Sequence, residues 1–271
     1  MQNKVILVGC GNMGFAMLKG WLDSGNLLAA NVHVVEPAQA LRERAQNLGV
    51  NVHGDADDLP KHLKPRMVLV AVKPQVMKDV LPAYRRFAAA ATFVSVAAGI
   101  PVSLFETCFG EDAAVIRCMP NTPAAIGKGM LATFANANVS EDDAAFVTEL
   151  LKTSGKVTSV DDEALIDVVT AISGSGPAYV FHFIEALSEA GTALGLPRET
   201  AALLAMQTVM GAGALADASA DTPTRLREQV TSPNGTTAAA LDVLMGEDRL
   251  RKLVTEAAQA AHRRAVELGQ G

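Results

Sequence analysis

A glycine-rich turn near the start of the chain has the spacing of a dinucleotide-binding site. Gly9, Gly11 and Gly14 directly follow the apolar run Val5–Val8 and precede a helical pattern. Glycines at this spacing let the backbone turn tightly and approach a pyrophosphate, whose charge then lies at the N-terminus of the helix. The residues expected to contact the dinucleotide are Gly9, Gly11, Asn12, Met13 and Gly14.

A carboxylate occupies the position that contacts the adenine ribose in such sites. Glu36 ends a second β-rich run, 22 residues after Gly14. An acid there accepts hydrogen bonds from the ribose hydroxyls and repels a 2′-phosphate, which favours NAD(H). Pro37 could turn the carboxylate away, and Arg42 or Arg44 could instead approach a phosphate. Both NAD(H) and NADP(H) therefore stay open as cofactors. Glu36 could also be only a solvated residue at the end of a strand, with no role in binding.

A second turn, close to the C-terminus, could bind a small anion. The segment Ser232–Gly235 precedes a helical pattern that begins near Thr236. Such a turn presents free backbone N–H groups and hydroxyls to a carboxylate at the positive end of a helix. The same residues could instead form only a helix N-cap with Pro233 at the first helical position.

The C-terminal part of the chain lacks the groups expected of a ketone reductase. His182 and His262 stand alone there, and Lys252 is the only lysine after residue 160. Reduction of a ketone normally requires a positioned proton donor. An iminium ion can arrive already protonated and accept a hydride on carbon without a strong protein acid. Thr237 could orient the substrate N–H or relay a proton through water, but it is a poor general acid by itself.

The elements that must position these residues are strands and helices in alternation. Helical patterns separate five β-rich runs, namely Lys4–Val8, Val32–Val35, Val68–Val72, Thr92–Ala97 and Ala114–Cys118. This alternation is typical of a parallel sheet wrapped by helices, and continuously apolar strands indicate that both faces are covered. The first helix should bury Leu18 and Trp21 and end at Gly25. We predict an α/β fold that begins with a Rossmann-type, doubly wound, mainly parallel sheet.

The second part of the chain is predicted to be all α-helical. β-rich runs stop near residue 160, and the helical patterns break at Gly174–Pro177, Gly195–Pro197, Thr222–Pro223 and Ser232–Gly235. We place a Rossmann dinucleotide-binding domain at residues 1–160 and an α-helical dimerisation and substrate-binding domain at residues 161–271. The uncharged run Thr200–Ala216 must be buried on most sides, and a domain of about 110 residues has little capacity to do so alone. We therefore expect a homodimer.

Composition argues against several other classes of protein. The formal net charge is −6 and no long basic run is present, which speaks against nucleic acid as a partner. No secretory signal is recognised at the N-terminus, and polar residues, Gly99 and Pro101 interrupt the uncharged stretch Phe87–Phe105, so a cytoplasmic protein without a membrane span is expected. The three cysteines are far apart and form no Cys-x-x-Cys pair, which argues against a disulfide framework and against a metal site.

Longer motifs make the chain resemble the pyrroline-5-carboxylate reductase family over essentially its whole length. They are Ala71–Gln75, Ser95–Ile100, Arg117–Ala124, Ser173–Tyr179 and Thr231–Thr237. The last motif is the most specific and departs at one residue, since the family usually has Gly where this chain has Asn234. Asn tolerates a positive φ better than most residues, so we expect the loop conformation to survive.

The resemblance implies reduction of L-1-pyrroline-5-carboxylate to L-proline by hydride transfer from NADPH or NADH, the last step of proline biosynthesis. It also implies a homodimer formed through the helical domain, and dimers of this family often gather into larger rings. The loop residues that would hold the nicotinamide half of the cofactor are Ala71, Val72, Lys73, Pro74, Ala98, Gly99 and Asn121. The turn of the partner subunit would bind the substrate carboxylate through Ser232, Asn234, Gly235 and Thr236, with Thr237 beside the substrate nitrogen. Thr237 and Ser175 are the expected catalytic residues.

Two other functions stay open from the sequence. A β-hydroxyacid dehydrogenase pairs a similar glycine turn with a helical domain, but it places a catalytic lysine on the first interdomain helix, and Tyr179–Glu185 contains none. A non-catalytic dinucleotide-sensing protein would bind the cofactor without turnover. The intact Thr236–Thr237 pair speaks against the sensor.

Overall fold

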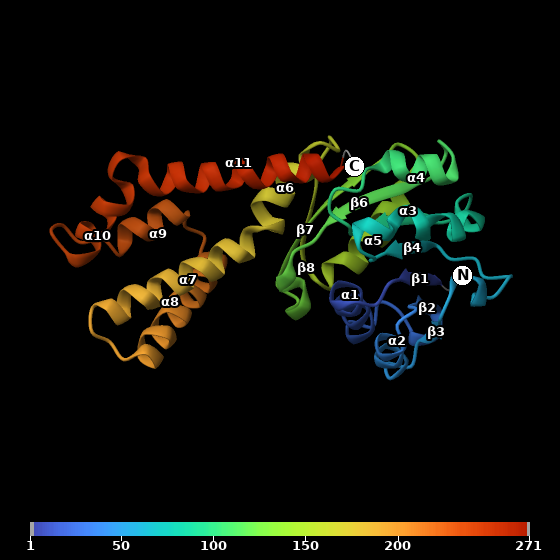
Figure 1. Ribbon diagram of the computed structural model, residues 1–271, viewed down its shortest axis with the longest axis horizontal. Helices are drawn as coiled ribbons and strands as arrows, with labels where there is room; N and C mark the ends of the chain where they lie inside the picture. Colours follow the sequence, from blue (N-terminus) through green and yellow to red (C-terminus); the bar gives the residue numbers. More distant parts are fainter. Residues whose placement is uncertain (1–2, 270–271) are drawn as a thin grey trace. The chain divides into compact units, whose positions relative to one another are not determined.

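The computed structural model describes residues 3–269, which fold as two compact units (Figure 1). The first unit extends to Ser175 and also includes the end of the chain from Ala261 on. The second unit comprises Gly176–Ala260. The predicted dinucleotide residues lie in the first unit, and the predicted substrate turn lies in the second.

A single eight-stranded sheet forms the centre of the first unit, in the order β3-β2-β1-β4-β5-β6-β7-β8. Its strands are β1 (Val5–Val8), β2 (Val32–Val35), β3 (Asn51–His53), β4 (Met67–Val70), β5 (Thr92–Ser95), β6 (Val115–Met119), β7 (Gly129–Ala135) and β8 (Gly155–Ser159). All neighbouring strands are parallel except β6 and β7. The strand order reverses between β1 and β4, and ligands bind at the carboxyl ends of the strands at such a reversal. The predicted α/β fold class is confirmed.

All five predicted strands form, with ends that differ by at most two residues. The prediction missed β3, β7 and β8. β3 has only three residues, and β8 consists of Gly-Lys-Val-Thr-Ser with mostly exposed side chains. Short or polar strands at the edge of a sheet lack the apolar periodicity by which strands are recognised.

Helices cover both faces of the sheet, which explains the continuously apolar strands. They are α1 (Asn12–Asp23), α2 (Gln39–Gln46), α3 (Met77–Val80), α4 (Val102–Phe109), α5 (Glu141–Lys152) and α6 (Leu165–Val169). Val5 and Leu7 of β1 pack on the face that contacts Trp21 of α1, whereas Ile6 and Val8 pack on the opposite face. Gly25 follows α1 with a φ of 73°, as expected for the residue that ends a helix.

Long helices form the second unit, namely α7 (Gly176–Ala193), α8 (Arg198–Ala218), α9 (Pro223–Gln229), α10 (Thr236–Met245) and α11 (Arg249–Gly269), whose last turns belong to the first unit. The starts of α7, α8, α9 and α10 match all four predicted breaks. At the first break a π-helical turn, Thr170–Gly174, precedes α7. Many large apolar side chains of α8 are exposed, including Leu203 and Met210. By length and composition alone α8 could cross a membrane.

Candidate active site

The glycine turn has the close contacts that its sequence predicts. Gly9 has a φ of 86°, and a Cβ atom there would lie 2.9 Å from both the Ala71 carbonyl oxygen and a Val72 methyl group. A Cβ atom on Gly14 would overlap the carbonyl oxygen of Gly9. Gly11 is the N-cap of α1 and no side chain caps this helix. The first N–H groups of α1 are therefore available to an anion.

Glu36 points toward this turn rather than into solvent. Its Oε2 accepts a hydrogen bond of 2.7 Å from the Cys10 N–H, and its Oε1 accepts one of 2.9 Å from the Ala38 N–H. The residue is only 6% exposed. Pro37 therefore does not turn the carboxylate away from the site. Each carboxylate oxygen keeps further acceptor capacity for a sugar hydroxyl.

The two nearby arginines brace the backbone around the glycine turn. Arg42 Nη1 donates to the carbonyl oxygens of Glu36 and Pro37, at 2.8 and 2.9 Å. Arg44 Nη2 donates to the Cys10 carbonyl at 2.8 Å, and its guanidinium lies 3.9 Å from the centre of the Phe15 ring. Both cations are thus already engaged with backbone carbonyls next to the site.

The thiol of Cys10 is a buried filler of this turn. Burial raises the pKa of Cys10 to about 11, although Arg44 opposes the rise. A thiol with that pKa stays protonated at neutral pH and is a weak nucleophile. Burial and this raised pKa favour a role for Cys10 as a small filler of the turn over a role as a nucleophile.

A cavity of about 380 Å³ lies beside Gly9 at the carboxyl end of β1. Residues that the sequence did not single out line much of it, including Val76, Val80 and Tyr84, together with the acids Asp55 and Asp79. Its size falls in the range of pockets for small ligands and cofactor fragments. These residues belong to no sequence motif. They reach the site only because the segments after β3 and β4 lie beside it.

Lys73 and Pro74 stand at the carboxyl end of β4. Lys73 is exposed and is the N-cap of a short 3₁₀ helix, Pro74–Val76. The Ala71 N–H donates to the Val8 carbonyl at 2.7 Å, which holds the start of this loop against the glycine turn. The structure therefore brings Ala71 and Val72 next to Gly9, and Lys73 and Pro74 follow them in the same loop.

Ala98 and Gly99 lie in the loop after β5, and this loop contacts the end of the chain. Gly99 has a φ of 71°, and a Cβ atom there would lie 3.0 Å from Leu268 Cβ in the last turn of α11. The close approach requires glycine at this position. Sequence motifs gave no indication that the C-terminal turn covers the loop.

Asn121 contacts the segment that leads to Ser175. The sequence gave no sign of this contact. Asn121 Nδ2 donates to the Ser173 carbonyl at 3.0 Å, and its Oδ1 accepts from the Met130 N–H at 2.9 Å. The Ser175 N–H donates to the Thr170 carbonyl at 2.8 Å and closes the π-helical turn. The Asn121 amide thus holds the chain two residues before Ser175.

The predicted substrate residues share one turn in the second unit. Asn234 has a φ of 60°, a left-handed conformation that Asn is expected to tolerate. The Gly235 N–H donates to the Ser232 carbonyl at 3.0 Å, and a Cβ atom on Gly235 would overlap the Ser232 hydroxyl. Gly235 is the N-cap of α10, so Thr236 and Thr237 are its first residues. Pro233 is therefore not the first helical residue.

The sheet order, the glycine turn and the buried acid define a dinucleotide-binding protein of the Rossmann type. Residues 163–268 match the family model for pyrroline-5-carboxylate reductase dimerisation, and residues 4–99 match the model for coenzyme F420-dependent NADP oxidoreductases. A pyrroline-5-carboxylate reductase of Pseudomonas aeruginosa is 39% identical over 98% of this chain and 97% of its own length. The chain belongs to the pyrroline-5-carboxylate reductase family.

Solved structures of the same family agree with this assignment. The pyrroline-5-carboxylate reductase of Coxiella burnetii has a TM-score of 0.93 and 34% identity, with 99% of each chain covered. The pyrroline carboxylate reductase of Plasmodium falciparum, whose structure has NADP bound, has a TM-score of 0.84 and 28% identity, with 98% of each chain covered. The predicted family is confirmed, and the chain is an NAD(P)H-dependent oxidoreductase.

Proposed function

We propose that the chain reduces L-1-pyrroline-5-carboxylate to L-proline with a hydride from NADPH or NADH, as the last step of proline biosynthesis. The observation that carries this proposal is the turn Ser232–Thr237. It combines hydroxyls, uncapped N–H groups and a helix N-terminus, but no acid or base of its own. Such a turn suits a substrate that brings a carboxylate to be bound and a nitrogen that needs no strong acid.

The dinucleotide is proposed to bind along the carboxyl ends of β1, β4 and β5, and it supplies the hydride. Its pyrophosphate fits the uncapped N-terminus of α1, next to Gly9, Gly11, Asn12, Met13 and Gly14. Glu36 is placed to accept hydrogen bonds from the adenine ribose. The nicotinamide half is proposed to lie against Ala71, Val72, Lys73, Pro74, Ala98, Gly99 and Asn121.

The substrate carboxylate is proposed to bind at the N-terminus of α10. Ser232, Asn234, Gly235 and Thr236 supply its hydrogen-bond donors, and the helix end adds a partial positive charge. A positive φ at Asn234 turns the backbone so that successive N–H groups can face one anion. Binding there would orient the ring and leave its imine carbon free to accept the hydride.

Thr237 and Ser175 are proposed as the groups closest to the reacting nitrogen. A hydroxyl can accept a hydrogen bond from an iminium N–H and can pass a proton to water. Neither side chain is a strong acid, so the substrate must enter protonated on nitrogen. The rate should therefore follow the protonation state of the imine rather than that of a protein group.

The family model for dimerisation supports a homo-oligomer built from the helical part of the chain. We assign residues 161–271 to dimerisation and substrate binding, and residues 1–160 to the dinucleotide. The exposed apolar side chains of α8 suit burial against a second copy. We further propose that dimers gather into a larger ring and that the enzyme acts in the cytoplasm. Light scattering and cell fractionation test these two points.

The reaction is tested directly by following the absorbance of the reduced nicotinamide with pyrroline-5-carboxylate present. Oxidation of NADPH or NADH with an equal amount of proline formed supports the proposal. If a folded protein binds dinucleotide but oxidises neither cofactor, the substrate assignment is wrong.

A further inference from the structure

One side of β6 holds the segment that leads to Ser175. Arg117, Met119 and Asn121 alternate along the strand and just beyond it, so their side chains share a face. Asn121 Nδ2 donates to the Ser173 carbonyl at 3.0 Å, and Met119 Cε would lie 2.5 Å from a Cβ atom on Gly174. The placement of residues 173–175 is therefore set by the end of β6.

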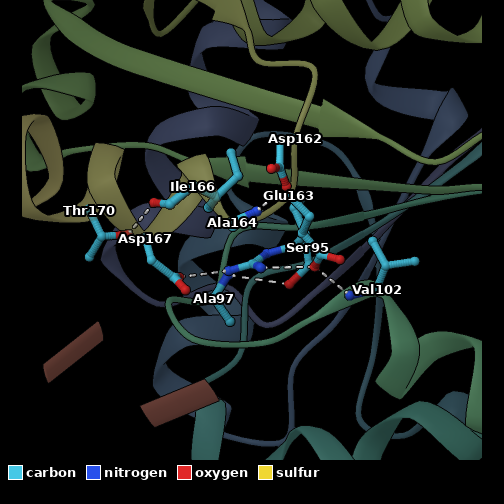
Figure 2. A network of polar contacts seen from close by, with 10 residues as sticks. Ser95, Ala97, Val102, Asp162, Glu163, Ala164, Ile166, Asp167 and Thr170 are labelled. Carbon is cyan, nitrogen blue, oxygen red and sulfur yellow. Dashed lines mark hydrogen bonds and ion pairs between the residues drawn. The ribbon is translucent and has the colours of Figure 1, made fainter. Parts of the chain in front are cut away.

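Arg117 anchors the same segment through ion pairs with two carboxylates. Figure 2 labels both of them, Glu163 and Asp167. Arg117 Nη1 lies 2.8 Å from Glu163 Oε1, and its Nη2 lies 3.4 Å from Asp167 Oδ1. Arg117 is only 5% exposed, so its charge must be paired inside the protein. One cation therefore holds two carboxylates that precede Ser175.

Glu163 also contacts the loop after β5. The same Oε1 that pairs with Arg117 accepts a hydrogen bond of 2.8 Å from the Val102 N–H. Val102 is the first residue of α4 and directly follows the loop that contains Ala98 and Gly99. A single carboxylate oxygen thus joins β6 to the far end of this loop.

The π-helical turn transmits the anchor to Ser175. Asp167 lies on α6, which continues into Thr170–Gly174, and the Ser175 N–H closes that turn on the Thr170 carbonyl. π-helical turns are uncommon and occur often at functional sites. A shift of α6 would therefore move Ser175.

We propose that Arg117 is a positioning residue whose ion pairs with Glu163 and Asp167 hold the Val96–Pro101 loop and the segment leading to Ser175 in one arrangement. One side chain thereby supports both the dinucleotide loop, through Glu163, and the placement of Ser175, through Asp167. The inference rests on the proposed function, which assigns the loop to the nicotinamide and Ser175 to the imine. Asn121 acts on the same segment through Ser173.

Two neutral variants separate the two arms of the anchor. Glu163→Gln weakens the tether to Val102, so the Kd and KM for NADPH should rise about fivefold while kcat changes little. Asp167→Asn loosens α6, so kcat should fall about fivefold at an unchanged dinucleotide Kd. Calorimetry gives the Kd, and steady-state rates give kcat and KM.

The matched control is Asp143→Asn. Asp143 on α5 pairs with Arg66 at 2.7 Å in the same unit. Arg66 directly precedes β4, so this ion pair lies at the amino end of that strand, away from the site. This variant should lower Tm while leaving Kd, KM and kcat unchanged. If Glu163→Gln and Asp167→Asn behave like Asp143→Asn, the anchor is only structural and the inference is wrong.

A charge-free variant separates stability from positioning. Arg117→Met alone leaves two unpaired carboxylates and should lower Tm, whereas adding Glu163→Gln and Asp167→Asn should restore much of it. We expect the triple variant to keep a raised Kd and a lowered kcat. Wild-type kinetics in the restored triple variant would overturn the proposal. The dinucleotide Kd of the variants can be measured without the imine. A wild-type enzyme that is inactive on pyrroline-5-carboxylate would therefore count against the proposed function, while the predicted change in Kd could still be tested.

Discussion

The carboxylate of Glu36 accepts a 2.7 Å hydrogen bond from the backbone N–H of Cys10, 26 residues earlier in the chain. This contact joins the end of β2 to the glycine turn after β1. The acid therefore braces the turn and also carries a negative charge beside the expected ribose site. A 2′-phosphate in that position would meet this charge, while both nearby arginines are engaged with carbonyls.

Replacing Glu36 by Gln should shift the cofactor preference toward NADPH. The ratio of kcat/KM for NADPH to that for NADH should rise about tenfold, since hydrogen bonds to charged groups are worth on the order of 1.5–3 kcal/mol. Steady-state rates with both cofactors give the ratio. Glu43→Gln, an exposed charge change on α2, is the control and should leave it unaltered. An unchanged ratio in Glu36→Gln would show that the carboxylate does not contact the ribose.

Substitutions in the α10 turn should separate binding from turnover. Thr237→Ala should mainly lower kcat and Ser232→Ala should mainly raise the KM for the imine acid, each about fivefold for one lost hydrogen bond. Steady-state kinetics at saturating cofactor measure both. If both variants match the parent enzyme, the proposed substrate turn is wrong.

The left-handed backbone at Asn234 predicts that substitution by Gly and substitution by Ala will affect the turn differently. Asn234→Gly should retain the turn and full activity, since glycine adopts a φ of 60° without strain. Asn234→Ala should cost about 1 kcal/mol of turn stability and raise the KM for the imine acid. Equal kinetics for the two variants would show that this conformation is not needed for binding.

Stability should fall in mild acid because of the buried histidine His33, which pairs with the half-buried His53. His33 Nδ1 lies 3.1 Å from His53 Nε2, and burial, with His53 and Lys4 nearby, lowers the pKa of His33 to about 4. The folded state thus keeps His33 neutral while the unfolded chain binds a proton below about pH 6.5. Its stabilising contribution is complete above pH 6.5 and is lost as the pH falls toward 4, by on the order of 2 kcal/mol.

Urea unfolding at pH 7 and pH 5 measures this effect. His33→Gln should reduce the difference in unfolding free energy between the two pH values. His62→Gln removes an exposed histidine and should leave the difference as in the parent. An equal pH dependence in all three proteins would exclude the His33–His53 pair as its source.

Sequence patterns predicted the parts of the fold that depend on local contacts. The glycine turn, the cap at Gly25 and the helix start at Thr236 each follow from a few neighbouring residues. Strands β7 and β8 were missed because their pairing is determined by contacts across the sheet rather than by their own periodicity. The domain assignment at residue 160 remains a proposal.

The polar contacts that position the site could not be predicted. Arg117 and Glu163 are 46 residues apart, and no spacing rule connects them. Asn121 was expected to face the cofactor, but the sequence gave no sign that its amide also holds Ser173 and Met130. The direction of the Glu36 carboxylate likewise depends on the tertiary position of Cys10.

The only tryptophan of the chain, Trp21, is fully buried on α1, the helix whose first turn is proposed to bind the pyrophosphate. Trp21 lies nine positions after Asn12, which corresponds to about 14 Å along a helix axis. Reduced nicotinamide absorbs light in the region where indole emits. Excitation energy should therefore pass from Trp21 to a bound reduced dinucleotide. The fluorescence of this one residue would then report how much cofactor the unlabelled enzyme has bound.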